Sequence, residues 1–210
     1  MKSESTTISN LLRQRILCSG PVTIGLLIAV LATVLCSSPA QSSERDAALW
    51  NALRSGGHIA LLRHAIAPGN GDPPEFRLGD CQTQRNLSAQ GRDQATRIGE
   101  LFHSHGIQTA QILSSQWCRC LETAHLLGLG PVEERPFLNS FFNDYARREP
   151  QTSMLREWLD QQALNEPIVL VTHQVNITAL TGVYPGSGEL VIVRRSETGD
   201  LTVVGTIETN

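Results

Sequence analysis

The sequence predicts an α/β fold: a three-layer α/β/α sandwich with a mainly parallel sheet and an antiparallel hairpin at one edge. Three segments of strand length are separated by segments with helical character, and strands that alternate with helices form parallel sheets. These segments are residues 58–64, 109–114 and 166–173. Near the end of the chain, residues 188–195 and 201–208 alternate in polarity around Glu197-Thr-Gly-Asp200, which is typical of a hairpin.

The strongest helical pattern covers residues 88–106, where Ser88 is placed to cap the helix and apolar residues recur at helical spacing. Residues 65–86 are rich in Pro and Gly and predict a long loop, of a length that is usually functional or disordered. Residues 132–138 predict a further strand or an irregular edge. Further helices are expected over residues 43–55, 116–127, 152–164 and 175–181.

Residues 1–40 have the order of a secretory signal peptide. Arg13 and Arg15 precede an apolar run over residues 22–36, and Ser38-Pro39-Ala40 offers small residues for cleavage. The alternative is a retained membrane anchor, but a membrane-spanning helix needs about 20 apolar residues. We therefore expect a signal peptide over residues 1–40, one domain over residues 41–210, and a periplasmic or secreted protein without a stable membrane span after cleavage.

The composition is that of an ordinary globular domain, with 40% hydrophobic residues, 18% charged residues and a formal net charge of −3. No lysine follows Lys2, and no basic tract suited to nucleic acid is present. We therefore expect no nucleic-acid partner. The remaining positive side chains are arginines, which can hold phosphate oxygens in a bidentate manner.

Reactive side chains follow the three predicted strands, at Arg63-His64, Ser114-Ser115 and Thr172-His173. In an open α/β sheet, sites form at the carboxyl ends of the strands. Phosphoryl transfer needs a nucleophile, positive charge around the phosphoryl oxygens and a proton for the leaving group. Arg119, near the start of a predicted helix, would bring a second arginine to the two histidines. These residue types predict a pocket for a phosphoryl group.

Four motifs along the chain resemble those of the histidine phosphatase (phosphoglycerate mutase-like) superfamily, and they occur in the family's order. Residues 61–65, Leu-Leu-Arg-His-Ala, are similar to its Arg-His-Gly signature, with Ala in place of Gly. Residues 114–124 resemble its Ser-x-x-x-Arg-x-x-x-Thr-Ala segment, and residues 169–173 resemble the strand with the second histidine. Residues 86–95 are similar to its Leu-Ser-x-x-Gly-x-x-Gln-Ala helix start.

The resemblance implies the phosphoglycerate mutase-like sandwich and assigns a role to each matching position. His64 would become a phosphohistidine, which water would then hydrolyse. Arg63, Arg119 and His173 would hold the phosphoryl oxygens, so no metal or other cofactor is required. Two further substrate contacts are expected, at Arg85 and Asn176.

The proton donor is where the sequence departs from the family pattern. The family's usual acid in a Leu-x-Glu segment is replaced by Ser140, and the acid that follows the second histidine in another branch is replaced by Gln174. Asp144 lies close to the first of these locations and is the candidate donor. The alternative is that Asp144 is an ordinary solvated loop acid.

Three cysteines remain after residue 40. Cys118 and Cys120 are too close to pair on a helix, so Cys81 must be one partner of any disulfide. Relatives commonly have a small buried residue at the position of Cys120. The resemblance therefore implies a bond between Cys81 and Cys118.

The export signal and the cysteine-containing segments resemble a periplasmic subgroup that includes the lipopolysaccharide core heptose-phosphate phosphatases. The expected activity is that of a histidine acid phosphatase-type phosphomonoesterase, acting on a small phosphorylated substrate such as a sugar phosphate of the cell envelope. The alternatives are a phosphoglycerate mutase-like phosphotransferase, a phosphatase of phosphohistidine proteins, and a catalytically weak module that binds phospho-sugars.

Overall fold

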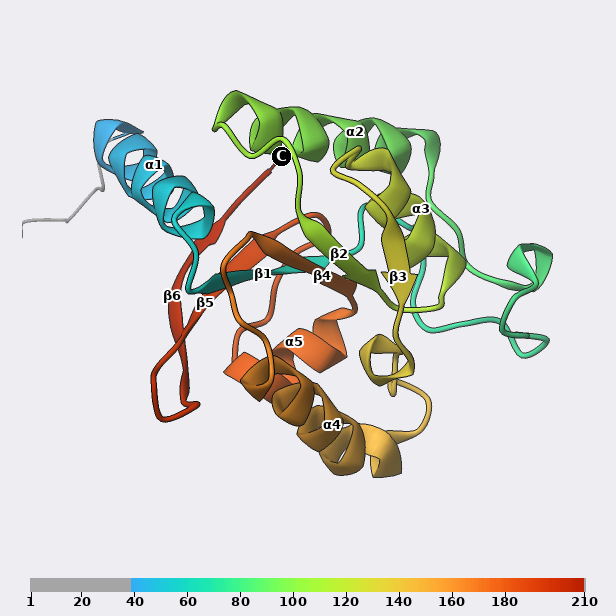
Figure 1. The fold of residues 1–210 in the computed structure, drawn as a ribbon. Coiled ribbons are helices and arrows are strands. Elements are labelled where there is room, and N and C mark those ends of the chain that lie inside the picture. Colours follow the sequence, from blue (N-terminus) through green and yellow to red (C-terminus); the bar gives the residue numbers. More distant parts are fainter. Residues whose placement is uncertain (1–38, 210) are drawn as a thin grey trace, which may run out of the picture. The chain divides into compact units, whose positions relative to one another are not determined.

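A six-stranded sheet forms the centre of the domain (Figure 1). The computed structural model describes residues 39–209, with side chains from residue 43 onward, so the predicted signal peptide lies almost wholly outside the described residues. The strands are β1 (His58–Arg63), β2 (Gln111–Ser114), β3 (Val132–Glu134), β4 (Ile168–Thr172), β5 (Leu190–Arg195) and β6 (Leu201–Ile207). Their order in the sheet is β3-β2-β4-β1-β5-β6.

The strand directions confirm the predicted fold class. β3, β2, β4 and β1 run parallel to one another, whereas β5 runs antiparallel to both β1 and β6. The sheet is therefore mainly parallel and ends in the expected hairpin. β2, β4 and β1 lie side by side, so the residues that follow them meet at one edge of the sheet.

Helices cover both faces of the sheet (Figure 1). One face packs against α1 (Pro39–Arg54), α2 (Ala89–Ser104) and α3 (Cys118–Leu126), and the other packs against α4 (Arg148–Asp160) and α5 (Gln174–Thr181). Residues on β1 alternate between the two apolar layers: Leu62 packs toward the first layer and Leu61 toward the second. No helix within residues 39–209 is long and apolar enough to cross a membrane.

Several element boundaries differ from the prediction. α1 begins at Pro39 rather than residue 43, and α4 begins at Arg148 rather than residue 152. Pro150 does not prevent the earlier start of α4, because the first-turn N–H groups of a helix have no intrahelical partner. Residues 132–138 divide into β3 and a 3₁₀ turn that starts at Pro136. Two further 3₁₀ turns cover Cys81–Thr83 and Tyr145–Arg147.

The start of α2 is held against the segment that leaves β1. Ser88 caps α2 by accepting a hydrogen bond from the Gly91 N–H at 3.0 Å, and its own N–H donates to the Ile66 carbonyl at 3.1 Å. A side chain at Gly91 would place its Cβ 2.1 Å from that carbonyl oxygen. Glycine is therefore required where the chain after β1 crosses the helix.

Candidate active site

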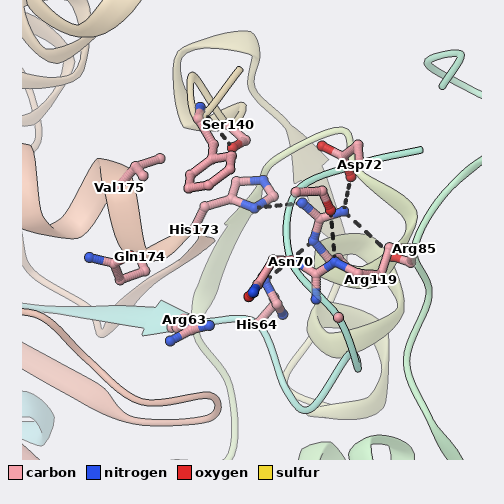
Figure 2. Close-up of a pocket in the computed structure, with 13 residues that line it drawn as sticks. Arg63, His64, Asn70, Asp72, Arg85, Arg119, Ser140, His173, Gln174 and Val175 are labelled. Atoms are coloured by element: carbon pink, nitrogen blue, oxygen red, sulfur yellow. Dashed lines mark hydrogen bonds and ion pairs between the residues drawn. The ribbon is translucent and has the colours of Figure 1, made fainter. Parts of the chain in front are cut away.

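A small pocket lies at the carboxyl ends of β1, β2 and β4 (Figure 2). Its volume is about 90 Å³, well below the roughly 300–1,000 Å³ of a pocket that encloses a drug-sized ligand. The lining combines basic, imidazole and amide groups with one carboxylate and a few apolar contacts. It is formed by Arg63, His64, Gly69, Asn70, Gly71, Asp72, Arg85, Arg119, Ser140, Phe142, His173, Gln174 and Val175.

His64 follows β1 and is buried, and its main-chain N–H donates to the Thr172 carbonyl of β4 at 3.0 Å. Its Nδ1 lies 2.8 Å from the Ala65 carbonyl oxygen, and only a protonated Nδ1 can make this hydrogen bond. The other ring nitrogen, Nε2, therefore carries the lone pair in the neutral ring. Nε2 is therefore the ring nitrogen that could act as a nucleophile.

Arg119, in the first turn of α3, connects the components of the pocket. Its side chain is only 2% exposed. Its Nε donates to Nε2 of His64 at 3.3 Å, and its Nη2 donates to Nδ1 of His173 at 3.4 Å. Its Nη1 forms an ion pair with Oδ1 of Asp72 at 2.6 Å. One guanidinium thus contacts both histidines and the acid.

His173 follows β4, and its tautomer is set by its two partners. Because Nδ1 accepts from Arg119, Nε2 carries the proton and donates to the Ser115 hydroxyl at 2.8 Å. That hydroxyl in turn donates to Oδ1 of Asn139 at 3.3 Å. The His173 ring is therefore fixed by a buried chain of polar groups, with Nδ1 directed toward the pocket.

Arg63 lies at the end of β1 and supplies a second cation. Its Nη1 donates to the Pro185 carbonyl at 2.8 Å. Its Nε is buried and has no hydrogen-bond partner among the described residues. A buried donor without a partner is rare in folded proteins. An anionic oxygen in the pocket would supply the missing acceptor.

Burial and the positive charge of the pocket keep both histidines neutral. Burial, together with the Arg119 guanidinium, lowers the pKa of His64 to about 3. The same two causes lower the pKa of His173 well below its ordinary value. Burial and the neighbouring Arg119 also lower the pKa of Arg63 and of Arg85. The His64 ring is therefore neutral even in mildly acidic solution.

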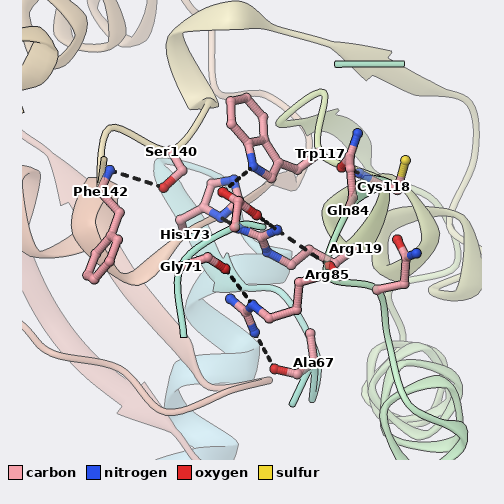
Figure 3. A network of polar contacts seen from close by, with 12 residues as sticks. Ala67, Gly71, Gln84, Arg85, Trp117, Cys118, Arg119, Ser140, Phe142 and His173 are labelled. Atoms are coloured by element: carbon pink, nitrogen blue, oxygen red, sulfur yellow. Dashed lines mark hydrogen bonds and ion pairs between the residues drawn. The ribbon is translucent and has the colours of Figure 1, made fainter. Parts of the chain in front are cut away.

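Arg85 was expected to contact substrate, and it does line the pocket. Its guanidinium also fastens the loop after β1, because its Nε donates to the Gly71 carbonyl at 2.9 Å and its Nη1 donates to the Ala67 carbonyl (Figure 3). Gln84 accepts a hydrogen bond from the main-chain N–H of Cys118 at 3.0 Å. The long loop is thus ordered by specific polar contacts.

Cys81 and Cys118 form a disulfide, as the resemblance implied. The bond joins the loop over residues 65–86 to the first residue of α3, directly before Arg119. Cys120 is a free, buried cysteine whose Sγ lies 3.5 Å from Nε2 of His173, and burial raises its thiol pKa to about 12. The Cys120 thiol therefore stays protonated beneath the pocket.

Two of the residues expected in the site lie elsewhere. Asp144 is exposed, precedes the 3₁₀ turn at Tyr145 and does not line the pocket. Asn176 is buried below the pocket and donates through Nδ2 to the Asn139 carbonyl at 2.9 Å. Asn176 therefore contacts the polar chain that holds His173 and does not line the pocket. The two positions where the family has an acid, Ser140 and Gln174, both line the pocket.

Sequence reasoning missed Asp72, the one carboxyl group among the described residues that line the pocket. Its side chain is 6% exposed, and its Oδ2 accepts a hydrogen bond from Nε1 of Trp117 at 2.9 Å. The available signal was weak, because Asp72 lies in a Gly- and Pro-rich loop where acids commonly favour turns. Its position depends on contacts with a distant helix.

Part of the chain matches the model of a known family. The family model of the histidine phosphatase superfamily (branch 1) matches residues 59–153, a span that includes Arg63, His64 and Arg119. No curated protein sequence gives a significant match.

Several solved structures share the fold at low sequence identity. The protein histidine phosphatase SixA with tungstate has a TM-score of 0.54 at 14% identity, covering 72% of this chain and 97% of that chain. A mutant phosphoserine phosphatase from Entamoeba histolytica with phosphoserine has a TM-score of 0.54 at 15% identity, covering 73% of this chain and 98% of that chain. A mycobacterial glucosyl-3-phosphoglycerate phosphatase with VO3 has a TM-score of 0.52 at 18% identity, covering 70% of this chain and 96% of that chain. These likenesses show the fold, and the family model identifies residues 59–153 as a match to the histidine phosphatase superfamily (branch 1).

Proposed function

We propose that the protein is a metal-independent phosphomonoesterase that transfers the phosphoryl group of its substrate to Nε2 of His64 and then to water. The observation that carries this proposal is the neutral His64 ring, with Nδ1 bound to the Ala65 carbonyl and Nε2 facing the Arg119 guanidinium. A nucleophile with a lone pair beside fixed positive charge is what attack on a phosphate requires.

The surrounding groups support the same chemistry. Arg119 and the unpartnered Nε of Arg63 are placed to donate to phosphoryl oxygens, and Nδ1 of His173 lies at the same guanidinium. Charge that develops on these oxygens during transfer would be stabilised without reorganisation of the site. The phosphoryl group would then pass from Nε2 to water, which restores the neutral ring.

The size of the pocket bears on the leaving group. A volume of about 90 Å³ has room for a phosphoryl group and little more. The rest of the substrate would therefore extend past the rim, where Phe142 is 51% exposed. An aromatic side chain at a rim suits an apolar or sugar-ring face, which supports a sugar phosphate of the cell envelope among the substrate classes.

An assay of the purified protein with p-nitrophenyl phosphate, in the presence of EDTA, tests the proposal. We expect hydrolysis by the wild type, no hydrolysis by His64→Ala and unchanged hydrolysis by the matched control His103→Ala, whose ring is exposed at the end of α2. Equal rates for wild type and His64→Ala would refute the nucleophile. A rate abolished by EDTA would refute the metal-independent mechanism.

A phosphatase of phosphohistidine proteins is the second candidate. Ser140 lines the pocket where relatives have an acid, and cleavage of a phosphorus–nitrogen bond needs little acid assistance. The shallow site would also accept a protein-borne phosphoryl group. A higher kcat/KM for a phosphohistidine peptide than for every alkyl phosphate in a panel would favour this activity.

We further propose export, with cleavage after Ala40. The charged segment, the apolar run and the small residues at 38–40 support a signal peptide, and the Cys81–Cys118 disulfide suits an oxidising compartment. Expression of the full chain in a bacterium tests this proposal by fractionation and mass spectrometry. A periplasmic protein that begins at Gln41 is expected, whereas an intact chain in the cytoplasm would contradict export.

A further inference from the structure

We propose that Asp72 is the proton donor to the leaving group, an inference that rests on the proposed function. Asp72 supplies the carboxyl group of the pocket lining, whereas Asp144 is exposed and lies outside it. The Asp72 side chain is 6% exposed. An acid that reaches a leaving oxygen must border the phosphoryl site, and Asp72 meets this requirement.

The position of Asp72 relative to the nucleophile supports this role. The Arg119 guanidinium lies between them: its Nε faces Nε2 of His64, and its Nη1 faces Oδ1 of Asp72 (Figure 2). In phosphoryl transfer, the attacking and leaving atoms are roughly in line on opposite sides of phosphorus. The Asp72 carboxyl group lies at the end of the guanidinium away from His64, where it would border a phosphoryl group that Arg119 holds.

The side chain of Asp72 is held in one orientation. Its Oδ2 accepts from Nε1 of Trp117 at 2.9 Å while Oδ1 pairs with Arg119 at 2.6 Å. Phe76, four residues along the same loop, stacks on the Trp117 ring at 4.9 Å between centroids. These contacts fix the orientation of a carboxyl group that lies on an irregular loop. A fixed orientation suits a group that must meet a leaving oxygen.

The substrate itself can supply the proton. A phosphate monoester has a second pKa of about 6, so in mildly acidic solution it enters with one proton on a phosphoryl oxygen. The phosphoryl group and the Asp72 carboxylate would then lie at the same guanidinium. The proton can therefore pass from the phosphoryl oxygen to the Asp72 carboxylate and be shared between them.

In the proposed reaction, one proton moves through Asp72 in each half. The shared proton passes from Asp72 to the leaving oxygen as the phosphorus–oxygen bond breaks and the bond from phosphorus to Nε2 of His64 forms, which releases an alcohol. In the second half, the Asp72 carboxylate takes a proton from water as the water oxygen attacks phosphorus. The bond to Nε2 breaks, and phosphate leaves with that proton.

The dependence of rate on the leaving group separates a proton donor from a residue that only orients Arg119. The quantity to measure is kcat/KM, since it covers the steps up to departure of the leaving group. p-Nitrophenolate leaves without a proton, whereas the alkoxide of an alkyl phosphate does not. We expect Asp72→Asn to lower kcat/KM about 10²–10⁴-fold for an alkyl phosphate, the usual contribution of general acid catalysis, and less than about 10-fold for p-nitrophenyl phosphate.

Matched variants complete the experiment. Asp80→Asn removes an exposed carboxylate from the same loop, and Asp144→Asn removes the acid expected from the sequence; both should leave the ratio of alkyl to aryl activity unchanged. Equal losses on both substrates in Asp72→Asn, or a selective alkyl loss in Asp144→Asn, would overturn the inference. If Asp72→Asn does not fold, Asp72→Glu keeps the charge and displaces the carboxyl group, and its loss must again be larger for the alkyl phosphate.

The same assays distinguish failure of the Asp72 donor role from failure of the His64 mechanism. A wild type that hydrolyses neither substrate, or a His64→Ala variant that hydrolyses both, would reject the phosphohistidine mechanism. A wild type with His64-dependent activity whose Asp72→Asn variant loses both activities equally would reject only the role of Asp72 as the donor.

Discussion

Arg119 donates through its Nε to Nε2 of His64 at 3.3 Å. The nucleophilic lone pair is therefore directed at the cation that would hold the phosphoryl group. A phosphoryl oxygen that accepts the Arg119 Nε hydrogen bond would free the Nε2 lone pair of His64 for attack on phosphorus. This single contact makes Arg119 central to both binding and attack.

Replacement of Arg119 by lysine tests the importance of the guanidinium geometry. Arg119→Lys keeps a positive charge but cannot donate to His64, His173 and Asp72 at once. We expect kcat for p-nitrophenyl phosphate to fall by roughly 10²–10³, the cost of losing a preorganised donor. Arg92→Lys, which alters an exposed ion pair with Glu122, is the matched control and should retain activity. Wild-type kcat in Arg119→Lys would show that charge alone suffices.

The buried ion pair between Arg119 and Asp72 predicts an effect on stability. Arg119→Ala leaves the Asp72 carboxylate buried and without its cation, which typically costs about 3–5 kcal/mol. Urea denaturation of the single and double variants measures this cost. The double variant Arg119→Ala/Asp72→Ala should recover part of the loss, because the uncompensated charge is then absent. A double variant less stable than Arg119→Ala would contradict this account.

The two buried histidines predict how stability changes with pH. The pKa of His64 is lowered to about 3 in the folded protein, against an ordinary value of about 6.5, so the unfolded chain binds more protons between these values. The free energy of unfolding should therefore fall as pH drops from about 6.5, by up to about 1.4 kcal/mol per pH unit for each such histidine. In His64→Ala the decline should be shallower, and an identical slope would contradict the assigned protonation state.

The disulfide predicts a third effect on stability. Cys81→Ser/Cys118→Ser removes the covalent link between the loop and α3, and loss of a native disulfide typically costs about 2–5 kcal/mol. The polar contacts of Arg85 and Gln84 remain, so we expect the variant to fold with reduced stability in thermal unfolding. Reduced wild type should match it, and a variant as stable as the oxidised protein would show that these contacts alone hold the loop.

The polar chain behind His173 predicts the effect of a residue outside the pocket. Asn139→Ala removes the acceptor of the Ser115 hydroxyl and of the Gln116 N–H. Each buried group left without a partner costs about 1–3 kcal/mol, and Ser115 would hold the His173 ring less firmly. We expect lower stability and a reduced kcat, while Asn165→Ala, in the exposed turn before β4, should change neither. Unchanged kcat in a folded Asn139→Ala would contradict the link to His173.

The sequence by itself determined the fold class and the central cluster. Arg63 ends a strand, and His64 and His173 each follow one; parallel strands bring their carboxyl ends to one edge of a sheet whatever the details of packing. Arg119 could be assigned because it lies a fixed distance beyond the end of its own strand. Local pattern and one topological rule predict that these residues meet, and the resemblance to the family supplies their expected roles.

Only the tertiary structure decided the rest of the pocket. Asp72 enters it because the loop over residues 65–86 is tied to Trp117, Arg119 and Cys118 from another part of the chain. Asp144 lies outside the pocket, and Asn176 donates to the Asn139 carbonyl beneath the pocket. The conformation of an irregular loop depends on contacts distant in sequence, and no periodicity within the loop records them.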